Sequence, residues 1–388
     1  MPIVNRIAEF ADEMTEWRRD LHAHPELGFK EHRTSDVVAA KLAEWGIEVH
    51  RGIAGTGIVG VLKCGNGAGS IGLRADMDAL PILERGEGPR EHRSTNDGVM
   101  HACGHDGHTT MLLGAARYLA ETKNFDGTVN FIFQPAEEGL GGGDKMVKEG
   151  MFDRFPCDTV WGMHNIPGIP VGSFAVSPGP MMAARDNFII KVQGRGSHGA
   201  MPHQGIDPVV VGAHLVMALQ TITSRNIEAQ DALVISVTQF EGGNAFNVVP
   251  DSVELRGTCR VFSPEVQASL PERIERIVNG VCATFGATGT LEYLKGYPAT
   301  INDPAQAVVA AEVAEALAGK ERVDRNPKPM MGAEDFSYML NQRPGAYIWA
   351  GNGDTAGVHH PDYDFNDDLL PHGASFWARL VEDRLPRP

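Results

Sequence analysis

The segment at residues 99–107, VMHACGHDG, gathers side chains that bind transition metals. Cys103 and His105 lie two residues apart, and further histidines and an aspartate flank them on a glycine-containing turn. A thiolate and an imidazole this close are convergent ligands for Zn²⁺, Mn²⁺, Co²⁺ or Ni²⁺. The pattern indicates a metal site, although a solvated polar loop with one incidental thiol is the alternative.

Three other segments supply further ligands. Residues 134–138 (QPAEE) follow an apolar strand-like run, and strand ends are where α/β folds bind ligands. Adjacent residues cannot aim at one point, so Glu137 and Glu138 suit one general base and one metal ligand, unless they belong to an ordinary acidic loop. His164 ends another apolar run, where a lone histidine is more often structural, and residues 357–361 (GVHHP) lie near the C-terminus. Together these segments supply enough ligands for two metal ions that share one ligand.

Composition narrows the class of protein. The chain has 388 residues, 42% of them hydrophobic and 22% charged, which predicts a globular protein of two domains. Its net charge of −16 argues against nucleic acid or an anionic membrane as a partner. The N-terminus lacks a basic stretch followed by an apolar one, and no apolar run is long enough to span a bilayer. Five scattered cysteines suit a reducing cytoplasm.

The order of strand-like and helical segments predicts the architecture. In the first part of the chain they alternate, with helices expected at 5–23 and 109–122, which indicates an α/β domain with a mainly parallel or mixed sheet. Further along, the order is strand, helix, strand, strand, helix, strand, which is the split βαβ arrangement of a separate α+β domain. We therefore expect one domain from residues 1–183 plus 299–388 and an inserted domain at 184–298.

Specific strings recur along nearly the whole chain. They are RRDLHAHPELGF (18–29), GLRADMDALP (72–81), GVMHACGHDGHT (98–109), FQPAEEG (133–139), GMHN (162–165), GRGSHGAMPHQGIDP (194–208), NVVPD (247–251), GAEDF (332–336) and HHPDYDFND (359–367). In these strings and their order the chain resembles the M20 metallopeptidase clan, specifically its amidohydrolase subfamily of hippurate, N-acyl-amino-acid and auxin-conjugate hydrolases. The resemblance implies a mixed-sheet catalytic domain with two divalent metal ions, and an inserted ferredoxin-like domain for dimerisation and closure over the site.

The resemblance also implies roles for individual residues. The implied metal ligands are Cys103, His105, Glu138, His164 and His359. Cys103 takes the place that a bridging carboxylate holds in related peptidases, and His359 fits the family pattern of His, a variable residue and Pro better than its neighbour does. Glu137 would act as general base. Asp76 would orient the site through hydrogen bonds, or would merely cap a strand end.

Substrate contacts are implied for the inserted domain. His198 would stabilise the oxyanion, reaching the site of the partner subunit in a dimer. Asn244 or Asn247 would grip the substrate, although their Gly-rich and Asn-rich surroundings are equally typical of a turn. Arg256 or Arg185 would bind a substrate carboxylate, although a surface position is the commoner role for arginine.

These features predict metal-dependent hydrolysis of the amide bond of N-acyl or N-aroyl amino acids, in a homodimer or tetramer that acts on small molecules. A dipeptidase or aminopeptidase on the same scaffold is the alternative, and it would need a group that binds a free α-amine. A non-catalytic metal-binding protein would not need Glu137. A nucleobase deaminase is excluded, because its Pro-Cys-x-x-Cys string does not occur. One departure from the family is the charged stretch at 82–98, which we expect to border the site and which leaves the acyl preference open.

Overall fold

The computed structural model describes residues 3–85 and 90–388, and the chain divides into two compact units. The first unit comprises Met1–Met181, Ile301–Lys328 and Asp335–Pro388, and the second comprises Met182–Thr300 and Pro329–Glu334. We expected residues 329–334 in the first domain, whereas they belong to the second unit. They join the second unit because the backbone N–H of Ala183 donates to the carbonyls of Met330 (3.0 Å) and Gly332 (2.9 Å). Residues 86–89 of the charged 82–98 stretch lie outside the described residues.

A mixed eight-stranded sheet forms the centre of the first unit. Its strands are β1 (Glu48–Ile53), β2 (Gly57–Cys64), β3 (Ser70–Asp76), β4 (Gly127–Gln134), β5 (Thr159–Ile166), β6 (Phe174–Ala175), β15 (Val323–Asp324) and β16 (Gly345–Gly351). They lie in the order β1-β2-β4-β3-β5-β16-β6-β15. The neighbours β4, β3, β5 and β16 run parallel, so their carboxyl ends share one edge. Ligand sites of open α/β sheets lie at that edge.

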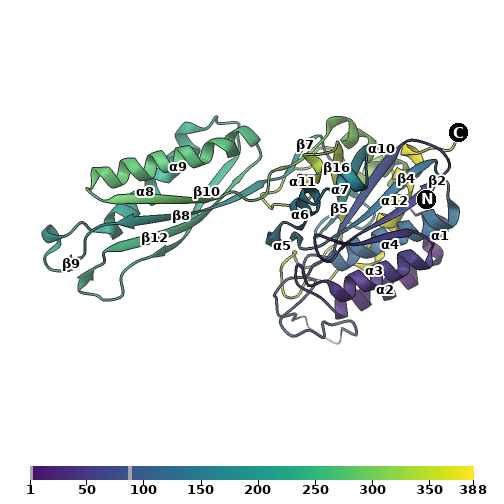
Figure 1. Ribbon diagram of the computed structural model, residues 1–388, viewed down its shortest axis with the longest axis horizontal. Helices are drawn as coiled ribbons and strands as arrows, with labels where there is room; N and C mark the ends of the chain where they lie inside the picture. The colour runs from purple at the N-terminus through teal and green to yellow at the C-terminus, as the bar shows by residue number, and fades with distance from the viewer. Residues whose placement is uncertain (1–2, 86–89) are drawn as a thin grey trace. The chain divides into compact units, whose positions relative to one another are not determined.

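Helices cover both faces of this sheet (Figure 1). They are α1 (Asn5–Glu9), α2 (Ala11–Ala23), α3 (His32–Glu44), α4 (His105–Thr122), α5 (Glu137–Leu140), α6 (Gly142–Lys148), α7 (Met151–Arg154), α10 (Pro304–Ala318), α11 (Ser337–Leu340) and α12 (Leu370–Arg384), with 3₁₀ turns at Lys320–Arg322 and Asp367–Leu369. Helix α4 is almost entirely buried and packs against α2, α12 and β3. Strand β16 is buried throughout, as expected for a strand covered on both faces.

Two helix predictions need correction. The helix expected at 5–23 is two helices, because Phe10 leaves the helical conformation with φ −116°. The helix expected at 109–122 begins earlier, at His105, directly after Gly104 with φ 85°. Glycine adopts this left-handed conformation without the steric cost that a side chain would add. As a consequence, His105 lies in the first turn of α4 and has the rigid support of a buried helix.

The second unit has a four-stranded antiparallel sheet in the order β10-β12-β8-β13. The strands are β8 (Ala184–Gln193), β10 (Leu233–Glu241), β12 (Ser252–Val261) and β13 (Thr288–Leu294), and the helices are α8 (Pro208–Thr221) and α9 (Pro264–Thr284). Shorter elements of this unit are β9 (Ser197–His198), β11 (Val248–Val249), a 3₁₀ turn (Pro202–Gln204) and a π-helical turn (Ile222–Asn226). Strands β7 (Gly179–Met182) and β14 (Thr300–Asn302) lie mostly in the first unit and pair with each other. Helices α8 and α9 lie along one face of the sheet (Figure 1). Burial alternates along β8, as expected for a sheet covered on one face only.

Among the residues that the structure describes, no helix combines the length and the apolar character needed to cross a bilayer.

Candidate metal centre

Cys103 and His164 meet where two segments reach the carboxyl edge of the large sheet. Cys103 precedes α4, and His164 lies near the end of β5. The Cys103 Sγ lies 3.3 Å from the His164 Nε2. The His164 Nδ1 lies 2.7 Å from the carbonyl oxygen of Asn165, so Nδ1 carries the proton and donates it there. This hydrogen bond leaves the Nε2 lone pair directed at the thiol, which is the usual arrangement of a metal-ligating histidine.

Glu138 and His359 form the second pair. The Glu138 Oε1 lies 3.0 Å from the His359 Nε2, although 221 residues separate them in the chain, as their numbers show. His359 adopts a left-handed backbone conformation with φ 65°, and its N–H donates to the Ala102 carbonyl at 2.7 Å. The hydrogen bond links the C-terminal segment to the turn that carries Cys103. The pair formed by Glu138 and His359 is thereby held next to the pair formed by Cys103 and His164.

His105 lies between two aspartates. Its Nδ1 is 3.3 Å from the Asp78 Oδ1 and its Nε2 is 3.7 Å from the Asp76 Oδ2. The His105 side chain is only 1% exposed, and within the described part of the chain neither ring nitrogen makes a hydrogen bond. Buried polar atoms are nearly always satisfied by a partner, and a neutral imidazole has one nitrogen with a free lone pair, so one ring nitrogen can bind a further group while the other faces an aspartate.

Backbone contacts fix the turn that carries Glu137 and Glu138. Both oxygens of Asp78 accept from this turn, one from the Glu137 N–H and the other from the Glu138 N–H, each at 2.9 Å. Ala136 just before them has φ 55°, and its N–H donates to the Glu31 carboxylate at 2.8 Å. The two carboxylates therefore aim adjacent glutamates in different directions. Glu137 is 7% exposed, and the Asp335 N–H donates to its Oε1 at 3.4 Å.

Asp76 makes its hydrogen bonds outside the predicted ligand set. Its Oδ2 accepts from the Arg74 guanidinium at 2.7 Å, and its Oδ1 lies 2.6 Å from the His108 Nδ1. The His108 Nε2 lies 2.7 Å from the Asn165 Oδ1 and 3.1 Å from the Asn165 backbone nitrogen. These bonds hold the His108 ring, whose centroid lies 4.6 Å from that of His164. Asp78, by contrast, contacts both a predicted ligand and the backbone of the predicted base.

The electrostatics of this cluster fit divalent cations. Burial alone would lower the pKa of His105, but Asp76, Asp78 and Glu138 raise it to about 10. Burial also raises the pKa of the Cys103 thiol well above its usual value, and Glu138 and Glu137 raise it further. Negative charge is thus concentrated in a buried region, where charges must be paired or bound to metal. A divalent cation would balance this charge and stabilise the thiolate.

The ligand atoms also lie close enough to bind common ions. Among the described residues, five groups have their ligand atoms within 4.8 Å of one another, and three of these consist of the predicted ligands and Glu137: Cys103, His105 and His164; Cys103, Glu138 and His359; and His105, Glu137 and Glu138. Cys103 belongs to two of the groups, which is the position that a bridging ligand would take. Cys, His and Glu together suit Zn²⁺ and neighbouring transition metals rather than Mg²⁺ or Ca²⁺.

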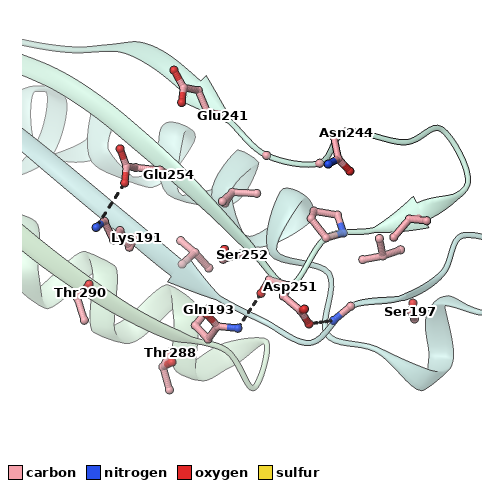
Figure 2. A pocket seen from close by; sticks show the side chains of 18 of the residues that line it. Lys191, Gln193, Ser197, Glu241, Asn244, Asp251, Ser252, Glu254, Thr288 and Thr290 are labelled. Carbon is pink, nitrogen blue, oxygen red and sulfur yellow. Dashed lines mark hydrogen bonds and ion pairs between the residues drawn. The ribbon is translucent and has the colours of Figure 1, made fainter.

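The remaining predicted residues lie in the second unit. His198, Asn244, Asn247 and Arg256 line an open groove of about 1280 Å³, which Figure 2 shows with Asn244 on its upper rim. His198 is exposed, and its Nδ1 accepts from the Ala200 N–H at 3.1 Å. Arg256 already pairs with Glu254 at 2.6 Å. Arg185 lies apart from the groove, with its guanidinium 4.5 Å from the Tyr297 ring centroid.

Several residues that hold the site received no role from the sequence. Asp78 could have been found, because it repeats the acidic residue of the ADMD string two positions later. His22 accompanied a family string without an assigned function, and its Nδ1 lies 2.8 Å from the Asp106 carboxylate behind the metal-binding turn. Glu31 and Arg74 gave no signal, because their contacts depend on how distant segments pack.

The chain is similar in sequence to known proteins over nearly its whole length. A family model for Peptidase family M20/M25/M40 matches residues 72–383. The hippurate hydrolase of Campylobacter jejuni is 41% identical over 381 residues, covering 98% of this chain and 99% of that protein. The N-acetylcysteine deacetylase of Bacillus subtilis is 36% identical over 374 residues, with 96% and 97% covered.

A solved structure extends the similarity to the fold. The crystal structure of a dinuclear metal-binding peptidase of the M20 family from Bacillus subtilis matches with a TM-score of 0.85 at 33% identity, and it covers 97% of this chain and 99% of that one. The mixed α/β architecture with its large sheet is therefore that of M20 structures. On this evidence, the chain belongs to the M20/M25/M40 peptidase family.

Proposed function

We propose that the protein is a metal-dependent amidohydrolase that cleaves N-acyl or N-aroyl amino acids into a carboxylic acid and an amino acid. One observation carries this proposal: Cys103, His105, Glu138, His164 and His359 form one cluster of ligand atoms, and the separately oriented Glu137 lies beside it. The relatives with hydrolase and deacetylase names support the same reaction class. The cluster would hold two divalent ions per subunit, drawn from Mn²⁺, Zn²⁺, Co²⁺ and Ni²⁺.

Glu137 is the group that we propose moves the proton. When bound, the ions would polarise the scissile carbonyl and make a water molecule more acidic. The Glu137 carboxylate accepts a proton from that water as its oxygen attacks the carbonyl carbon. It then donates this proton to the amine nitrogen as the C–N bond breaks, so Glu137 ends in its starting state. The hydrogen bond from the Asp335 N–H to Oε1 keeps the carboxylate in place, while Asp76 and Asp78 support the surrounding ligands.

His198 is the proposed donor to the oxyanion. Because its Nδ1 accepts from the Ala200 N–H, the neutral ring carries its proton on Nε2, which can donate. We propose that it acts on substrate bound by the partner subunit of a homodimer, or of a tetramer made of two such dimers. Asn244 and Asn247 would contact the substrate, and Arg256 would attract its carboxylate.

The proposed setting is the cytoplasm, with small molecules as substrates and no nucleic acid or membrane partner. The five cysteines are all free thiols in the structure, which suits a reducing compartment. The net charge of −16 disfavours polyanionic partners.

A substrate screen on metal-reconstituted protein tests the function. Apoprotein loaded with each of the four metals is assayed on N-acetyl, N-benzoyl and longer N-acyl amino acids, and on matched dipeptides with a free α-amine. We expect turnover of the N-acyl series. Turnover confined to the dipeptides would favour the peptidase alternative, and no turnover of either series despite full metal loading would favour a binding protein.

A further inference from the structure

Two charged side chains of the stretch at 82–98, those of Glu84 and Arg90, are directed into the first unit, whereas Arg85, Glu91, Arg93 and Asp97 are exposed. The Glu84 side chain is 3% exposed and that of Arg90 is 18% exposed, and they lie 3.3 Å apart. Side chains that contacted substrate at the mouth of a site would be more exposed to solvent. Glu84 and Arg90 therefore have an internal role.

The partner of this stretch is the turn that follows His359. The Arg90 guanidinium donates from Nη1 to the Tyr363 carbonyl and from Nη2 to the Asp362 carbonyl, each at 2.9 Å. The Arg85 N–H donates to the Pro361 carbonyl, also at 2.9 Å. Three consecutive carbonyls of the turn are thus bound by this one stretch. An arginine fork that spans two carbonyls fixes both their positions and their orientation.

Glu84 is itself fixed from behind. Its Oε2 accepts from the Ser94 N–H at 2.7 Å, and its Oε1 lies 3.4 Å from the Nε2 of the buried His22 in α2. The carboxylate that pairs with Arg90 is therefore itself fixed by Ser94 and His22, which restricts where the Arg90 guanidinium can lie. The contact is a fixed support and not a pair of mobile surface charges.

The turn needs such support because of the backbone of His359. A non-glycine residue at φ 65° is strained and persists only where its surroundings determine its conformation. On its N-terminal side the constraint is the hydrogen bond from the His359 N–H to Ala102. On its C-terminal side the constraint is the set of contacts from Arg85 and Arg90. With either side released, the backbone would relax and carry the imidazole away from Glu138.

We propose that Glu84 and Arg90 are positioning residues that hold the 361–363 turn and thereby keep His359 directed at Glu138. This inference rests on the proposed metal-binding role of His359. It predicts that the unusual loop tunes the affinity for one of the two ions and leaves the other ligands in place.

The test is Co²⁺ titration of apoprotein, followed by the visible absorption of the bound ion. His359→Ala identifies the part of the signal that depends on His359. In Arg90→Ala we expect the His359-dependent absorption to appear only at a Co²⁺ concentration at least about tenfold higher than in the wild type. This is the usual scale for loss of a residue that orients a ligand. Arg90→Lys keeps the positive charge but cannot bind two carbonyls at once, so the Co²⁺ concentration that it requires should lie between those of the wild type and Arg90→Ala. Arg325→Ala is the matched control, because it removes an arginine with an ion pair to Glu315 and should leave the titration unchanged.

A double variant separates positioning from general destabilisation. In a His359→Ala background, Arg90→Ala should weaken Co²⁺ binding no further, because the two residues act through one ligand. An additive loss in the double variant, or wild-type Co²⁺ binding by Arg90→Ala, would overturn the proposal. If Arg90→Ala does not fold, the same comparison is made with Glu84→Gln and Arg90→Lys. Metal binding needs no substrate, so these outcomes are distinct from a failure of the proposed amide hydrolysis.

Discussion

The metal-ligand candidates of the first unit are mostly buried and held by other side chains, whereas the candidates of the second unit are exposed on turns. Cys103 is 7% exposed and His105 is 1% exposed. His198 and Asn244, by contrast, lie on the rim of an open groove, on a short strand and a turn. Groups that must concentrate charge need a fixed, poorly hydrated environment. Groups that recognise a variable substrate can remain solvated until it binds. We therefore expect substitutions to have large effects in the first unit and graded effects in the second.

Metal removal should have the largest effect, because the proposed reaction needs the ions to polarise the scissile carbonyl and to make water more acidic. Dialysis against a chelator should abolish turnover of an N-acyl amino acid, and one of Mn²⁺, Zn²⁺, Co²⁺ or Ni²⁺ should restore it. The apoprotein should also unfold at a lower temperature, because bound ions stabilise the folded state. Metal content, turnover and thermal unfolding are measured on the same samples. Full turnover by metal-free protein would contradict the proposal that the first unit holds a catalytic metal site.

Glu137→Gln should come next. The amide keeps the shape and can still accept from the Asp335 N–H, but it cannot take a proton from water. We expect turnover to fall by about 10²- to 10⁴-fold, the scale of a lost general base, with bound metal unchanged. Glu138→Gln is the control, and it should lose metal. If the two variants behave the other way round, the roles of the adjacent glutamates are exchanged.

His198→Ala tests whether an exposed residue of the second unit can matter as much as a buried one. We expect turnover to fall about 10²- to 10³-fold, as for a lost oxyanion donor, with metal content intact. Mixing this variant with Glu137→Gln distinguishes action across subunits, because each mixed dimer would carry one intact site. Recovered activity supports action in the partner. No recovery, with subunit exchange demonstrated, would place His198 in its own chain's site or outside catalysis.

Arg256→Ala should have the smallest effect. The side chain is half-exposed and pairs with Glu254, so it offers a substrate carboxylate only a solvent-screened charge. We expect the KM to rise about two- to fivefold with kcat unchanged, because exposed ion pairs contribute little. The same substrates with an amidated carboxyl should show no difference between variant and wild type. A large fall in kcat would mean that Arg256 acts in the reaction itself.

The sequence predicted regular elements well where one signal acted alone. The predicted order of strand, helix, strand, strand, helix and strand at 184–298 matches the order β8, α8, β10, β12, α9 and β13 in the structure. The helix expected at 5–23 was wrong at Phe10 because its apolar spacing continues across the break. The Phe10 ring is 2% exposed and the Arg117 guanidinium lies 4.5 Å from its centroid, so tertiary burial outweighed local periodicity. Strand β1 was missed because its exposed, polar residues lack a strand pattern.

The site shows the same division. Ligand types and family strings named residues that the structure brings together, such as Cys103 and His164. The residues that hold them were not predictable, because they act through backbone groups of segments remote in sequence. Glu31 supports Ala136, and Arg90 binds two carbonyls of the C-terminal segment. The spacing of residues along the sequence does not predict such contacts, because they form only when remote segments pack together.

The place of β16 in the sheet has a consequence for how the protein matures. The strand lies between β5 and β6, with Trp349 opposite His164, yet it is made after the segment Met182–Thr300 of the second unit, and His359 follows it. Until then, a nascent chain that emerges from its N-terminus would carry Cys103, Glu138 and His164 beside an unfilled position in the sheet. The complete ligand set forms only after the segment with His359 has left the ribosome, so ions acquired earlier would be held by an incomplete site and would exchange readily.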